Sequence, residues 1–135
     1  MHKILIAGID TVAGANLAAW LAGRHQVFGL SWRKPVVVAG CETAVCDGRA
    51  EEAAEQWIES LRPQVVVGCG PAAESSWQSG PRLSDEHVRQ LPVWALAARG
   101  YGAQFTLISS DAVFTGPWMF HSEKSQSFCP SPEAR

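Results

Sequence analysis

The sequence predicts an α/β protein, in which a parallel sheet carries helices on both faces. Short apolar segments alternate with segments of helical spacing along the 135 residues. The first apolar segment, 3–7, leads into a glycine turn, and the last, 104–109, leads into a run of hydroxyl and carboxylate side chains. Strands separated by helices of this length form parallel sheets with right-handed crossovers. Ligands bind such sheets at the carboxyl ends of the strands, where both of these features fall.

The order of elements follows from apolar spacing and from turn residues. Strands are predicted at 3–7, 26–30, 64–69 and 104–109, with one more inside 36–46. Helices are predicted at 14–23, at 50–61, and from Ser84 or Asp85 to about Gly100 or Gly102. We expect Pro92 to kink or restart the third helix, because proline removes a backbone hydrogen bond.

The turn after the first strand has the form of a phosphate-binding loop. Gly8 permits a tight turn, and Gly14 lets the next helix start close to the strand, so backbone N–H groups including that of Val12 can face a pyrophosphate. The side chain of Thr11, between the glycines, either crowds such a ligand or donates a hydrogen bond to it. Asp10 opposes a phosphate unless its carboxylate points away. The alternative is a glycine turn that only joins strand to helix.

The ends of later strands supply the other expected cofactor contacts. The run 31–34 follows the second strand, where an acidic residue favours NAD and an arginine suits the 2′-phosphate of NADP. This run contains Ser31 and Arg33 and no acidic residue, which favours NADP over NAD. A solvated basic turn is the alternative. Cys69 and Gly70 end the fourth strand and are expected to lie beside the cofactor.

These segments resemble the extended short-chain dehydrogenase/reductases, most closely the dTDP-4-dehydrorhamnose reductase branch. That branch has the pattern Ser-Thr-Asp-Tyr-Val-Phe-x-Gly at strand five. The stretch 61–67 is similar to the family's approach to strand four, and Thr11 replaces the middle glycine of the family's Gly-x-x-Gly-x-x-Gly. The strand-five pattern is matched by Ser109, Ser110, Asp111, Val113, Phe114 and Gly116, with Ser110 for the threonine and Ala112 for the tyrosine.

The resemblance implies a Rossmann-like doubly wound parallel sheet of about five strands in the order 3-2-1-4-5, truncated before strand six. Alternation alone leaves a flavodoxin-like order open. The resemblance also implies NADP or NAD as cofactor and a nucleotide sugar as substrate. Ser110 matches the catalytic hydroxyl that binds the substrate's carbonyl or alcohol oxygen; its alternative role is to satisfy backbone groups. Asp47 matches an aspartate that contacts adenine, or it is a simple turn residue.

The resemblance covers only the first half of a family member. Residues 1–115 are expected to form the NAD(P)-binding domain, and 116–135 a loop-like tail leading toward a missing C-terminal part. Family catalysis also needs a Tyr-x-x-x-Lys pair for proton transfer. Tyr101 is the only tyrosine, and Phe105 stands four residues later. Two interpretations stay open: the NAD(P)-binding half of a sugar-nucleotide oxidoreductase that does not turn over alone, or a non-catalytic nucleotide-sensing or regulatory module.

Composition argues against several other classes. With 11 basic and 13 acidic residues, the chain has no charge excess that would favour nucleic acid or an anionic membrane. No apolar run approaches the roughly 20 residues that span a bilayer, so a cytoplasmic location is expected. The four cysteines lack metal-site spacing and are expected to be reduced thiols. Strand five would form a sheet edge, so the isolated chain is expected either to be marginally stable or to self-associate through that edge.

Overall fold

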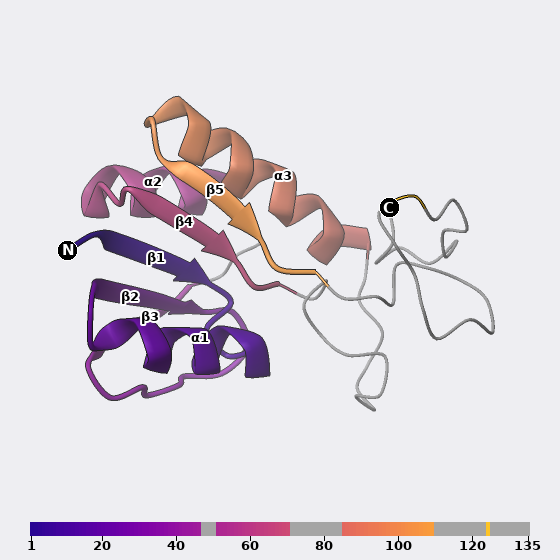
Figure 1. Cartoon of the computed structure of the whole chain (residues 1–135). Helices are drawn as coiled ribbons and strands as arrows, with labels where there is room; N and C mark the ends of the chain where they lie inside the picture. The colour runs from indigo at the N-terminus through magenta and orange to yellow at the C-terminus, as the bar shows by residue number, and fades with distance from the viewer. Residues whose placement is uncertain (47–50, 71–84, 110–123, 125–135) are drawn as a thin grey trace.

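The computed structural model describes residues 1–46, 51–70, 85–109 and 124 and shows one five-stranded sheet with three helices (Figure 1). Its order is β3-β2-β1-β4-β5, with every pairing parallel. The predicted order is confirmed, and the flavodoxin-like alternative is excluded. The strands are β1 (Lys3–Ala7), β2 (Gln26–Ser31), β3 (Cys41–Val45), β4 (Val65–Gly68) and β5 (Gln104–Leu107).

The helices divide between the two faces of the sheet. Helix α1 (Val12–Ala22) packs on one face through Ala18 and Leu21. Helices α2 (Glu51–Leu61) and α3 (Asp85–Gly100) pack side by side on the other face (Figure 1). Helix α1 starts two residues earlier than predicted, because Thr11 caps it.

Helix α3 continues through Pro92 without a break, so the predicted restart is wrong. Proline inside a helix costs about 3 kcal/mol, because it lacks the N–H and crowds the carbonyl four residues earlier. Pro92 lies on the exposed side of the helix. On the opposite side, Trp94, Ala97 and Ala98 are buried. Burial of that apolar side stabilises the helix despite the proline.

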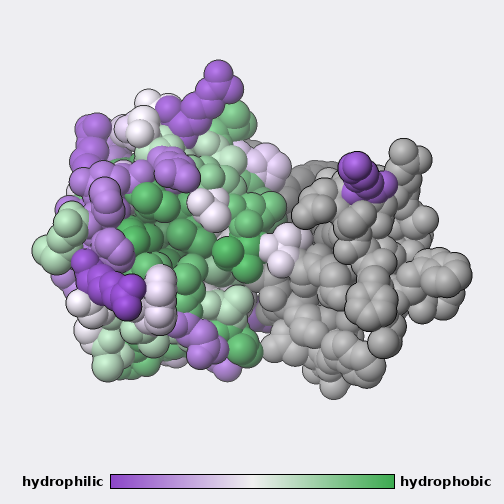
Figure 2. Space-filling view, viewed as in Figure 1, coloured by the Kyte–Doolittle hydropathy of each residue, from purple (hydrophilic) through white to green (hydrophobic). Residues whose placement is uncertain are grey.

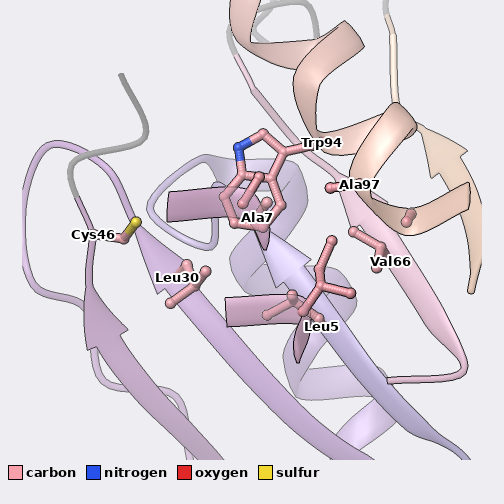
Figure 3. Close-up of a cluster of buried hydrophobic side chains, with 10 residues drawn as sticks. Leu5, Ala7, Leu30, Cys46, Val66, Trp94 and Ala97 are labelled. Carbon is pink, nitrogen blue, oxygen red and sulfur yellow. The ribbon is translucent and has the colours of Figure 1, made fainter. Parts of the chain in front are cut away.

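The larger hydrophobic core lies between the sheet and helices α2 and α3. The indole of Trp94 is almost fully buried and packs over Ala7 and Leu30 near the carboxyl ends of β1 and β2 (Figure 3). Ala54 and Ile58 close this core from α2. The same packing fixes how the first turns of α3 sit above the sheet.

The face of the sheet that carries α1 is only partly covered by described residues. Helix α1 contacts β1, β2 and β3, whereas β4 and β5 lie beyond it. Figure 2 shows apolar residues gathered in the middle of the visible face, where β1, β4 and β5 lie toward the viewer. Strand β5 is mostly exposed, and Leu107 at its end is 45% exposed.

The strand register brings the expected site residues to one edge. Ala7 pairs with Leu30 on β2 and with Gly68 on β4, so the three strands end level. After β1 the chain turns into α1 on one face, and after β4 it continues to α3 on the other. A crevice forms where crossovers leave neighbouring strands in opposite directions, and ligands bind there.

Candidate functional site

Gly8 forms a turn that no other residue fits. Its φ is +95°, a conformation that side chains disfavour. A Cβ on Gly8 would lie 2.4 Å from the carbonyl oxygen of Cys69 across the crevice. The turn is also bound to β2, because the N–H groups of Gly8 and Ile9 both donate to the carbonyl of Leu30, at 2.9 and 3.0 Å.

Gly14 allows α1 to begin directly against this turn. A Cβ there would lie 2.4 Å from the Gly8 carbonyl oxygen. The Thr11 hydroxyl, buried beneath the turn, donates to that carbonyl oxygen at 2.8 Å and accepts from the Gly14 N–H at 3.0 Å. Its hydrogen is therefore used within the loop. Val12 and Ala13 are the first two residues of the helix, so their N–H groups have no carbonyl acceptor within it.

The Asp10 carboxylate points away from the helix start. It accepts hydrogen bonds from the backbone N–H groups of Trp32 at 3.2 Å and Arg33 at 2.9 Å. Its Oδ2 also lies 3.6 Å from Nε of Arg33; the Asp10 side chain is 2% exposed and that of Arg33 is 53% exposed. Asp10 thus joins the glycine turn to the turn after β2, and its charge is balanced within the protein.

At the end of β2, two side chains carry polar atoms that have no partner among the described residues. Ser31, the last residue of the strand, is 1% exposed, and its Oγ makes no hydrogen bond to them. The indole Nε1 of Trp32 is buried and also lacks a partner. Of the predicted pair, Arg33 is the residue that reaches solvent, whereas Ser31 is enclosed.

The end of β4 lies opposite the glycine turn. Cys69 donates its N–H to Ala7 at 2.7 Å. Burial raises the pKa of its thiol to about 11, so the group is neutral at physiological pH. A Cβ on Gly70 would lie 3.0 Å from the Trp32 ring, so the indole extends from the end of β2, past β1, to the end of β4.

Sequence reasoning missed Gln90 and gave no role to Trp32. Gln90 is 5% exposed, and both polar atoms of its carboxamide lack hydrogen-bond partners in the described part of the chain. A glutamine inside a helix carries no local signal of burial, so only packing reveals it. Trp32 stood within the run 31–34, but its reach to Gly70 depends on strand order.

The remaining predictions fall elsewhere. Ser110, Asp47 and most of the tail 116–135 lie outside the described residues. Tyr101 is described and lies between α3 and β5, at the amino ends of the strands, whereas the glycine turn lies at their carboxyl ends. There the Arg62 guanidinium stacks 5.1 Å from its ring centroid. The tyrosine therefore contributes nothing to the site.

Three solved structures have similar folds. The chain matches L-threonine dehydrogenase from Clostridium difficile with a TM-score of 0.81 and 17% identity, over 99% of this chain and 45% of that one. It matches a hypothetical dTDP-4-dehydrorhamnose reductase from Sulfolobus tokodaii with a TM-score of 0.77 and 19% identity, over 98% of this chain and 48% of that one. It matches WbmG of Bordetella bronchiseptica, solved with NAD and UDP, with a TM-score of 0.74 and 18% identity, over 98% of this chain and 45% of that one.

The chain spans less than half the length of each of these proteins. No protein-family model and no curated protein sequence matches it. None of the described helices is long and apolar enough to cross a membrane. The resemblance read from the motifs is confirmed by the structural matches, which have the same Rossmann-like fold as this chain.

Proposed function

We propose that this chain is the NAD(P)-binding part of a sugar-nucleotide oxidoreductase similar to dTDP-4-dehydrorhamnose reductase, and that it does not turn over substrate by itself. The observation that carries the proposal is that Gly8 and Gly14 have no space for a side chain. At both positions a Cβ would meet backbone atoms at 2.4 Å, so the turn is built without side chains where the crevice opens. WbmG, a protein of the same fold, binds NAD.

The start of α1 is the part of the crevice suited to the pyrophosphate. The N–H groups of Val12 and Ala13 and the positive end of the helix dipole attract anions. The first turn holds no acidic residue. Asp10 adds no repulsion there, because Arg33 and two backbone N–H groups bind its carboxylate.

Arg33 is our candidate for the 2′-phosphate that distinguishes NADP. It lies at the end of β2 and its side chain is half exposed. Its guanidinium presents N–H donors in a planar fork, a geometry that matches the oxygens of a phosphate. On the same proposal, Cys69 and Gly70 lie beside the cofactor from β4, and Asp47 contacts the adenosine.

Catalysis would need groups from beyond this site. A bound nicotinamide supplies the hydride chemistry, and Ser110 would bind the substrate oxygen. The proton has to come from a positioned acid, which typically contributes about 10²–10⁴ in rate. Tyr101, at the opposite edge of the sheet, cannot be that acid. The position of Tyr101 also supports the second candidate function, a nucleotide-sensing module without catalysis.

The test is calorimetric titration of the purified chain with NADPH and NADH. We expect both to bind, NADPH more tightly. Arg33→Ala should remove most of the preference, whereas Arg24→Ala should retain it, because Arg24 follows α1 at the other edge of the sheet and lies over Trp20. Absence of binding at millimolar concentrations would overturn the proposal. Equal affinities would overturn the role of Arg33 alone.

A further inference from the structure

Gln90 lies at the same edge of the sheet as the glycine turn. Helix α3 runs antiparallel to the strands, because it connects the parallel strands β4 and β5. Its early turns therefore lie over the carboxyl ends of the strands. Gln90 precedes Trp94 by one helical turn, and Trp94 packs over Ala7 and Leu30, the last rows of β1 and β2 (Figure 3). Gln90 thus lies one layer above this core, level with the crevice.

The carboxamide of Gln90 is buried and unpaired within the described part of the chain. Gln90 is 5% exposed, and neither Nε2 nor Oε1 has a hydrogen-bond partner among the described residues. Burial of an unpaired donor and an unpaired acceptor destabilises a fold. A side chain in this position is explained when a ligand supplies both bonds.

The surroundings of Gln90 suit a flat ring. Leu91, the next residue of α3, and the Trp32 indole both meet at Gly70, where a Cβ would lie 3.4 Å from Leu91 and 3.0 Å from the indole. The indole is flat and only partly buried. Its backbone N–H donates to the Asp10 carboxylate at 3.2 Å, which holds the backbone of Trp32 in place.

We propose that the Gln90 carboxamide binds the edge of the adenine base of the dinucleotide, beside the Trp32 indole. The inference rests on the proposed function, because it assigns the base-recognising group of that site. Adenine carries an amino donor next to a ring-nitrogen acceptor, and a glutamine carboxamide matches this pair with two hydrogen bonds. On this proposal the Trp32 indole moves away from Gly70 when the adenine enters. The adenine ring then lies against the apolar surface of Leu91 and Trp32.

The experiment compares NADP⁺ with its 1,N6-ethenoadenine derivative, in which the amino group and ring nitrogen of adenine are bridged. We expect the wild-type chain to bind NADP⁺ about tenfold more tightly than the derivative. Gln90→Leu should bind the two ligands about equally, at the weaker level. Gln56→Leu, a matched change at an exposed position of α2, should retain the tenfold preference.

Thermal unfolding of the same variants supplies a second readout. Because the Gln90 carboxamide is unpaired, Gln90→Leu should unfold at the wild-type temperature or above it. A marked loss of stability, or an unchanged tenfold preference in Gln90→Leu, would overturn the inference while the proposed function stands. If the wild-type chain binds neither ligand, the proposed function and this inference fall together.

Discussion

The carboxylate of Asp10 binds the backbone N–H of Arg33 at 2.9 Å and lies 3.6 Å from the Nε of the same residue. One acidic side chain from the turn after β1 thus holds both the backbone and the side chain of the turn after β2. On the proposed function, these two turns form the adenosine side of the cofactor site. This contact adds to the two hydrogen bonds from Gly8 and Ile9 to the Leu30 carbonyl, which also hold the first turn against β2.

Asp10→Asn should loosen the turn after β2. The asparagine keeps one acceptor oxygen but loses the charge and one backbone hydrogen bond, so we expect the free energy of unfolding to fall by about 1–2 kcal/mol. The ion pair adds little to this figure, since Arg33 is half exposed. Urea unfolding measures the change. Glu42→Gln on β3, an exposed position, is the control and should stay near wild type.

Gly14→Ala should destabilise the fold by about 1–3 kcal/mol, because the added methyl group overpacks against fixed backbone atoms. The Gly8 carbonyl oxygen, 2.4 Å from the new Cβ, cannot rotate away. Dinucleotide binding should be lost together with this stability. Unfolding curves and calorimetry on the same sample test both effects.

Gly23→Ala is the matched control for that change. Gly23 ends α1 with φ −74°, and a Cβ there meets nothing within 4 Å. Alanine at such a position reduces the entropy of the unfolded chain, so we expect a gain of about 0.4–1 kcal/mol. If both variants were equally stable, the close approach of α1 to the turn would not be a constraint.

Cys69 should make stability depend on alkaline pH. Burial raises the pKa of its thiol from 9.0 to about 11. Between these values the thiol ionises in the unfolded chain and stays protonated in the fold, so the unfolded state binds fewer protons and stability falls as pH rises. Urea unfolding at pH 8 and pH 10 should show a smaller loss for Cys69→Ala than for wild type. An identical loss in the two proteins would contradict the assignment.

Leu107→Pro should suppress self-association if the chain pairs through β5. The N–H groups of Gln104 and Ile108 donate to Gln64 and Gly68 on the β4 side. In a parallel strand the alternate residues Phe105 and Leu107 then turn their N–H groups outward. Proline at 107 removes an outward donor only, whereas Thr106→Pro removes an inward one and should destabilise the sheet. Sedimentation velocity across a range of concentrations would compare the association of Leu107→Pro with that of the wild-type chain. If Leu107→Pro associated as strongly as the wild type, self-association through β5 would be excluded.

The chain alone should not oxidise NADPH in the presence of a dTDP-4-keto sugar. The reaction needs a positioned acid, and the only tyrosine lies at the wrong edge of the sheet. Absorbance at 340 nm follows the reaction. Turnover that disappears in Ser110→Ala would overturn this prediction and show that the acid lies within these residues.

The alternation of strands and helices and the glycine turn could be predicted from the sequence, because both are local patterns, whereas the strand order came from the family resemblance. The behaviour of Pro92 could not, since the buried side of α3 outweighs the local preference of proline. The direction of Asp10 depends on a contact 23 residues away, and the burial of Gln90 depends on how α3 meets the sheet. In each case the missing information lies in tertiary packing and not in neighbouring residues.

The two hydrogen bonds that the Leu30 carbonyl accepts also affect the sequence of events in folding. Gly8 and Ile9 find their acceptor on β2, which is synthesised only after the whole of α1. A peptide of β1, the turn and α1 alone therefore lacks the group that holds the turn in shape. Closing this loop costs chain entropy before the contact forms. The glycine turn therefore reaches its final conformation only after the first parallel strand pair has assembled.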